Sequence, residues 1–123
     1  MGLIGGARDD ASSSNRREHG VWAPLLAPGE QVQEAYRLGR TALVFTGRRL
    51  IVVEEGMTGR QVDYLSIPYR SITHFAVEAS GQFSQDADLR IWVAGRTAPI
   101  EKSFGREADV YVVQALLAQR IPG

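Results

Sequence analysis

The side chains of this sequence best suited to proton transfer at neutral pH are its two histidines, His19 and His74. Catalysis by such a group requires a second acid, base or nucleophile close to it. His19 lies in a polar N-terminal stretch, and His74 alternates with Ala76 and Glu78 on the predicted solvent face of a strand. We interpret His74 as a solvent-facing strand residue in preference to a general base. The sequence therefore predicts no catalytic residues and a protein that is not an enzyme.

The patterns that resemble metal or cofactor sites are also incomplete. Asp86 and Asp88 are spaced so that both carboxylates would reach a cation, but a solvated loop that enters a strand explains them better. Residues 56–59 and 2–6 are rich in glycine. Neither stretch has the Lys-Ser/Thr pair of a phosphate-binding loop or the strand-to-helix context of a dinucleotide site. The chain has no cysteine, so we expect no thiolate ligand, no metal site and no cofactor.

Four arginines flank consecutive predicted turns and form the candidate anion patch: Arg37, Arg40, Arg48 and Arg49. Gathered at one end of the fold, they would attract an anionic group; scattered, they would be ordinary solvated charges, which is the favoured interpretation. Fourteen Lys and Arg balance fourteen Asp and Glu, so no long-range field favours nucleic acid or anionic lipid. We expect no nucleic-acid binding and no strong membrane binding.

These residues are positioned by a chain in which apolar and polar residues alternate as they do in β-strands. β-Branched and aromatic residues recur with a period of two between short turns that contain Gly or Pro, a pattern typical of antiparallel strands. It predicts seven strands in a barrel or sandwich, at residues 30–38, 41–46, 50–53, 61–67, 72–79, 88–94 and 98–104. Residues 107–120 lack Gly and Pro and end on Arg120, which predicts a closing helix. A weaker, short helix is predicted near 16–26, after Ser and Asn residues that can cap it.

The predicted closing helix carries more apolar surface than one face requires. Val110, Val113 and Leu117 form one stripe, and Val112 and Leu116 extend the apolar surface beyond it. A helix that is apolar on more than one side needs two partners, and the second partner would be another subunit.

Trp92 is a further candidate for an interface. Alternation places it on the strand face opposite Leu89 and Ile91, where it is either an interface anchor or a residue covered by the closing or N-terminal helix. We therefore predict that Trp92, Val112 and Leu116 contribute to an oligomer interface.

Length and composition limit the alternatives. A chain of 123 residues corresponds to one domain of ordinary size. Its apolar runs are far shorter than the roughly 20 residues that span a bilayer, and residues 1–7 lack the length and basic flank of a secretory signal. With no cysteine present, a reducing compartment is favoured. We predict a cytoplasmic protein with a polar N-terminal segment at 1–26, which contains the short helix, and a β domain at 27–123.

Three stretches of the sequence are similar to the bacterial pleckstrin-homology (PH) domain family: TALVFTGRRLIVV at 41–53, GMTGR at 56–60 and YLSIPYRSIT at 64–73. The similarity continues in the family's order over about residues 27–118. The resemblance implies a bent antiparallel barrel of seven strands, capped by the C-terminal helix. It also implies a ring-shaped homo-oligomer, with a pentamer favoured, and it brings no catalytic residues. His74, where a family member often has Arg or Lys, and the longer polar N-terminus depart from the family pattern.

Two functional hypotheses follow. The first is a non-enzymatic, self-assembling binding or scaffold domain of PH-like type that presents its surface to an unidentified protein partner. The alternative is a weak anionic lipid or headgroup-binding module that uses the four arginines. The short turn at residues 38–41 leaves little room for a headgroup, which favours the first hypothesis. An enzyme is the third and least favoured reading.

Overall fold

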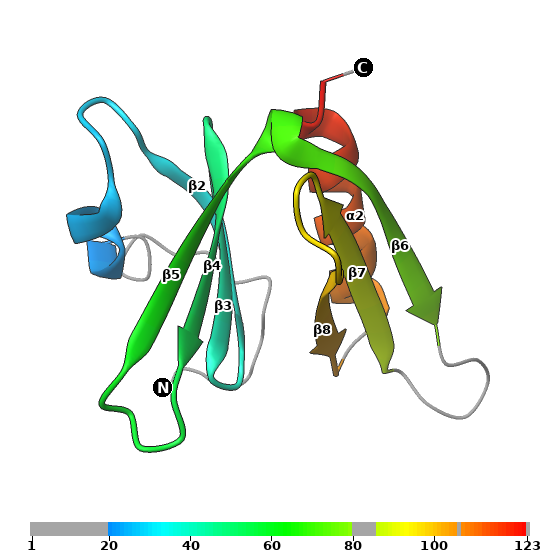
Figure 1. Cartoon of the computed structure of the whole chain (residues 1–123), viewed down its shortest axis with the longest axis horizontal. Helices are drawn as coiled ribbons and strands as arrows, with labels where there is room; N and C mark the ends of the chain where they lie inside the picture. The colour runs from blue at the N-terminus through cyan, green and yellow to red at the C-terminus, as the bar shows by residue number, and fades with distance from the viewer. Residues whose placement is uncertain (1–19, 80–85, 106, 123) are drawn as a thin grey trace. The chain divides into compact units, whose positions relative to one another are not determined.

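The computed structural model describes residues 20–79, 86–105 and 107–122. These residues form seven strands and a C-terminal helix, as the ribbon drawing illustrates (Figure 1). The described residues fall into two compact units, with the division between Ile67 and Pro68. The first contains η1 (Ala23–Leu25), β2 (Val32–Leu38), β3 (Thr41–Thr46), β4 (Arg49–Glu55) and β5 (Val62–Pro68). The second contains η2 (Tyr69–Ser71), β6 (Ile72–Ala79), β7 (Ala87–Val93), β8 (Ile100–Phe104) and α2 (Glu107–Arg120).

The mainly β fold with a closing helix is confirmed, but the strands do not close into one barrel. They form two antiparallel sheets, one of order β2-β3-β4-β5 and one of order β6-β7-β8. The division falls at Pro68, which lacks an N–H group for the strand ladder, and at the 3-10 turn that follows it. The prediction of a single closed barrel is therefore corrected to two sheets. The predicted domain boundary at residue 26 stays a prediction.

The first sheet is a meander built on short turns. Gly39 and Arg40 link β2 to β3, and Gly39 has a φ of 65°, a conformation that suits glycine. At the next turn the Thr46 hydroxyl accepts hydrogen bonds from the backbone N–H groups of Arg48 and Arg49, both at 3.1 Å. Consecutive apolar residues of β3 and β4 are buried, and because side chains alternate between the two faces of a strand, both faces of the sheet are covered there. Predicted strands 41–46 and 50–53 are thereby confirmed.

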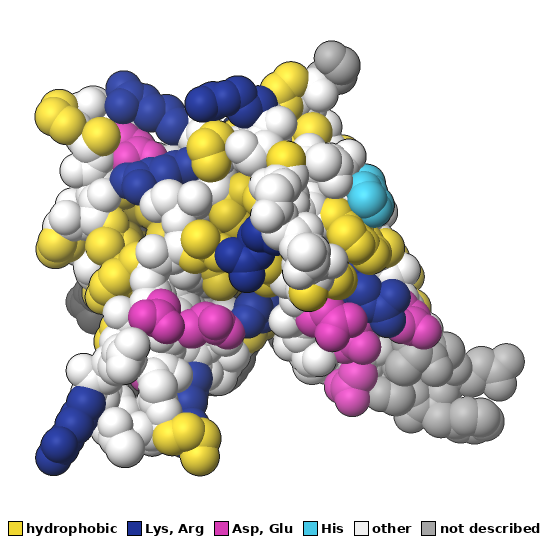
Figure 2. All heavy atoms as spheres, in the orientation of Figure 1, with side chains coloured by type: hydrophobic (Ala, Val, Ile, Leu, Met, Phe, Trp, Pro, Cys, Tyr) yellow, Lys and Arg dark blue, Asp and Glu magenta, His cyan; other side chains and the backbone are white. Residues whose placement is uncertain are grey.

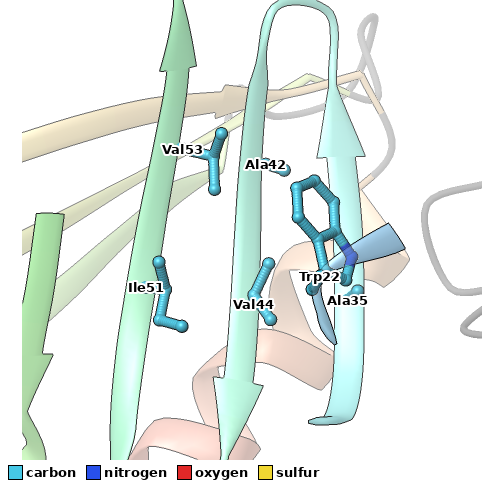
Figure 3. Close-up of a cluster of buried hydrophobic side chains, with 6 residues drawn as sticks. All are labelled: Trp22, Ala35, Ala42, Val44, Ile51 and Val53. Carbon is cyan, nitrogen blue, oxygen red and sulfur yellow. The ribbon is translucent and has the colours of Figure 1, made fainter. Parts of the chain in front are cut away.

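One face of this sheet is covered by Trp22. Of the predicted short helix at 16–26, residues 20 and 21 are helical and η1 is a 3-10 turn; residues 16–19 lie outside the described part. The Trp22 indole is 5% exposed. Figure 3 shows it above an apolar cluster made by alternate residues of three strands: Ala35, Ala42, Val44, Ile51 and Val53.

The second unit is a three-stranded sheet with α2 packed on it (Figure 1). Val110, Val113 and Leu117 of the helix are completely buried. Leu89 and Ile91 supply buried side chains from β7. The predicted stripe of the closing helix is thus its buried face, and the residues of its opposite face point away from the sheet.

Candidate functional site

The described residues contain no catalytic constellation. The imidazole of His74 is stacked on the indole of Trp92, with ring centroids 4.4 Å apart and an interplanar angle of 13°. Its Nδ1 lies 3.0 Å from the Thr73 hydroxyl, in an exposed position. No group of three or more metal-ligating side chains occurs in the described ranges. His19 and the stretch 2–6 lie outside those ranges.

The four arginines of the predicted patch divide into two pairs. Arg37 and Arg40 lie at the β2–β3 turn, and Arg48 and Arg49 lie at the β3–β4 turn. Consecutive turns of an antiparallel meander lie at opposite ends of the sheet. Because a strand rises about 3.4 Å per residue, the six-residue strand β3 separates the pairs by roughly 17 Å. The four side chains do not gather into one patch.

Arg49 is held in a hydrogen-bonded ion pair with Glu30. Its Nε and Nη2 donate to the two Glu30 carboxylate oxygens, each at 2.8 Å. Nη2 also donates to the Leu25 carbonyl at 2.7 Å and Nη1 to the Ser66 hydroxyl at 2.7 Å. Arg49 thereby ties the segment before β2 to strands β4 and β5. All three of its guanidinium nitrogens are engaged in the structure, so Arg49 acts as a structural residue.

Glu30 is the buried carboxylate at the centre of this network. It also accepts hydrogen bonds from the Ala27 N–H at 2.9 Å and the Thr46 hydroxyl at 2.7 Å. The hydrogen bonds from Arg49 lower the pKa of Glu30 from 4.5 to about 2, against the opposing effect of burial. Glu30 is therefore ionised at neutral pH and contributes to the fold in that form.

Arg37 and Arg40 line a pocket in the first unit. The pocket has a volume of about 180 Å³ and lies on the Trp22 side of the sheet. The Arg37 guanidinium carbon is 5.3 Å from the centroid of the Trp22 ring, and Arg40 Nη1 lies 2.9 Å from the Met57 sulfur. The remaining lining residues are Val21, Pro24, Leu25, Ala42, Val53, Glu55, Val62 and Tyr64. The pocket combines an apolar floor with charged groups at its margin.

The predicted interface residues have different environments in the second unit. Val112 is 45% exposed and Leu116 is partly exposed, so both side chains extend beyond the fully buried stripe of α2. Tyr111, which sequence reasoning missed, is 47% exposed beside them. Trp92 is half-buried under its stack with His74, on the sheet face opposite Leu89 and Ile91. The stacked neighbour of Trp92 is thus His74 of the adjacent strand, and its role as an interface anchor stays a prediction.

Around Trp92 the outer face of the second sheet is polar. Arg90 makes ion pairs with Glu78 on β6 at 2.9 Å and with Glu101 on β8 at 2.7 Å. Figure 2 shows basic and acidic side chains side by side at several places on the molecular surface. This interspersed pattern agrees with the zero net charge of the sequence.

Two antiparallel sheets followed by a closing helix define a PH-like domain, and the comparisons identify its family. The family model of the bacterial PH domain matches residues 6–121. The chain belongs to the bacterial PH domain family. A membrane-spanning helix is not found in the part of the chain that the structure describes.

Individual relatives match most of the chain. A pleckstrin homology domain from Shewanella amazonensis has a TM-score of 0.77 at 38% identity, covering 88% of this chain and 98% of its own. A DUF1696 family protein from Shewanella loihica has a TM-score of 0.78 at 36% identity, covering 91% and 97%. The uncharacterized protein YjqA of Bacillus subtilis is 40% identical, covering 96% of this chain and 97% of its own.

Proposed function

We propose that this chain is a non-enzymatic binding domain that assembles with copies of itself into a ring, with a pentamer favoured, and presents the ring to a protein partner. The observation that carries the proposal is the exposed apolar face of α2. Tyr111 and Val112 are about half exposed although the helix already buries a full stripe of its own. A helix face of this kind is stabilised when another subunit removes it from water.

The placement of the two predicted contact areas supports a ring over a two-fold dimer. One area is the outward face of α2, formed by Tyr111, Val112 and Leu116. The other is the Trp92–His74 stack on the opposite side of the same unit, across the sheet from the helix. Two different areas that face away from each other suit head-to-tail contacts, and a head-to-tail contact that closes makes a ring.

Mixing two variants tests this contact directly. Val112→Glu should disable the helix area and Trp92→Glu the sheet area, so that each variant alone is a folded monomer by native mass spectrometry. In a mixture, the intact sheet area of the first meets the intact helix area of the second, and a one-to-one heterodimer is expected. Gln114→Glu, exposed elsewhere on the same helix, is the matched control and should remain a ring. Failure of the mixture to pair would contradict the head-to-tail contact.

Binding to anionic lipid is the second candidate, and it is favoured only by Arg37 and Arg40. Arg49 is engaged with Glu30, and Arg48 lies at the other end of the sheet. Two basic residues near an anionic surface contribute about 1 kcal/mol each, which supports weak and salt-sensitive adsorption. The cytoplasmic location expected from the sequence stays a prediction.

A further inference from the structure

The pocket beside Trp22 lies over one row of paired side chains of the first sheet. Arg37, Ala42 and Val53 are register partners on β2, β3 and β4, and all three line the pocket. Figure 3 shows Ala42 and Val53 side by side on the face that Trp22 covers. They give the pocket an apolar floor. A space of about 180 Å³ is below the usual range for drug-sized ligands, which limits an occupant to a small molecule.

Two opposite charges stand at the margin of the pocket. Arg40 and Glu55 both line it, both are exposed, and they are neighbours across two strands, since the Glu55 N–H donates to the Arg40 carbonyl at 3.0 Å. Residues two positions apart share one face of a strand and lie about 7 Å apart. The charged pair is therefore the next row after Ala42 and Val53, within the reach of one small molecule.

The two charges of this row do not neutralise each other in the structure. Arg40 Nη1 contacts the Met57 sulfur at 2.9 Å, and within the described residues the Glu55 carboxylate has no hydrogen-bond or ion-pair partner. A thioether sulfur is a weak hydrogen-bond acceptor, whereas a hydrogen bond from a guanidinium to a carboxylate is charge-assisted and stronger. Arg40 would therefore exchange the sulfur for the carboxylate of a ligand.

We propose that this pocket binds a free α-amino acid with a compact apolar side chain, such as leucine. The ligand carboxylate accepts hydrogen bonds from Arg40, the ammonium group donates to Glu55, and the apolar side chain leaves water for the surface of Ala42 and Val53. A ligand with one charge alone leaves the opposite charge of the pocket unmatched and meets repulsion from the other, which favours a zwitterion. The site lies in the first unit and the proposed ring contact in the second, so the two proposals fail separately.

Isothermal titration calorimetry of the full-length protein tests the ligand class. L-Leucine should bind in a saturable way at millimolar concentration. Three analogues each lack one recognised feature: 4-methylpentanoate lacks the ammonium group, isoamylamine lacks the carboxylate, and glycine lacks the apolar side chain. The first two should bind about tenfold more weakly than leucine, the loss expected for one charge-assisted hydrogen bond. Glycine should also bind more weakly, because it buries no apolar surface.

Two variants locate the charges. Arg40→Gln and Glu55→Gln should each weaken leucine binding about tenfold. Glu55→Gln should not weaken the binding of 4-methylpentanoate, which has no ammonium group for Glu55 to accept from. Both residues are exposed, so both variants should keep the circular dichroism spectrum of the parent. The matched controls are Arg60→Gln and Glu54→Gln, which change exposed residues outside the pocket and should leave leucine binding unchanged.

Three results would each overturn the proposal. The first is the absence of saturable binding at millimolar leucine. The second is an affinity for 4-methylpentanoate or isoamylamine equal to that for leucine, which would mean that the pocket reads one charge only. The third is an unchanged leucine affinity in Arg40→Gln or in Glu55→Gln.

Discussion

Removal of the Glu30 charge should destabilise the first unit more than any surface substitution. Glu30→Gln keeps the size of the side chain but replaces a carboxylate oxygen by an NH₂ group. The ion pair with Arg49 is then lost. Each Glu30 oxygen accepts two of the four hydrogen bonds from Ala27, Thr46 and Arg49, so two of these donors face an NH₂ group instead of an acceptor. The Arg49 guanidinium then keeps its charge beside a neutral carboxamide, whose NH₂ group cannot accept hydrogen bonds.

The magnitude follows from the pKa of Glu30. Folding lowers that pKa from 4.5 to about 2, and one pKa unit corresponds to about 1.4 kcal/mol. The ionised carboxylate therefore stabilises the fold by about 3 kcal/mol at neutral pH. Because the folded pKa is the lower one, this stability is present above pH 4.5 and is lost as the pH falls from about 4.5 to about 2.

Urea unfolding followed by circular dichroism checks both statements. At pH 7, Glu30→Gln should lower the free energy of unfolding by about 3 kcal/mol. Between pH 4.5 and 2, the variant should lose less stability than the parent, because the titrating group is gone. Glu78→Gln is the matched control: its side chain is 67% exposed in its pair with Arg90, so a loss of about 0–1 kcal/mol is expected. A loss in Glu30→Gln no larger than in this control would refute the reasoning.

Three further outcomes are expected. Gly39→Ala should cost about 1 kcal/mol of unfolding free energy, because the φ of 65° strains any other residue, whereas Gly20→Ala should cost little; equal costs would contradict the turn geometry. His74→Ala should expose the stacked face of Trp92 and shift its fluorescence emission to the red, with a stability loss of about 0.5–1 kcal/mol; an unchanged spectrum would argue against the stack. The protein should not co-sediment appreciably with anionic vesicles at physiological salt; tight binding that Arg40→Ala abolishes would favour the lipid-binding alternative.

Local signals predicted the strands and the closing helix well. The apolar and mostly β-branched run at 50–53, between two turns, favours a strand over a helix, and it lies inside β4 (Arg49–Glu55). The stripe of Val110, Val113 and Leu117 was also identified from helical spacing, and these residues are buried. Features set by short-range pattern are therefore visible in the sequence.

Features that depend on pairing between distant segments were not predicted. Glu30 and Arg49 are 19 residues apart, and nothing in their local sequence distinguishes them from solvated charges. The four arginines do not gather, as the favoured interpretation of the sequence had it, because consecutive turns lie at opposite ends of a meander. The pocket residues Trp22, Glu55 and Tyr64 come from separate elements that only the folded sheet brings together. A signal for Trp22 existed, because this large apolar side chain, flanked by Val21 and Ala23, follows a long polar stretch.

The central claim is self-assembly, and the mass of the intact protein in solution tests it most directly. Native mass spectrometry or light scattering of the unmodified chain at micromolar concentration is the measurement. For a pentamer of the 13.5 kDa chain, the account predicts a single species of about 68 kDa. A folded monomer of 13.5 kDa under the same conditions would contradict it.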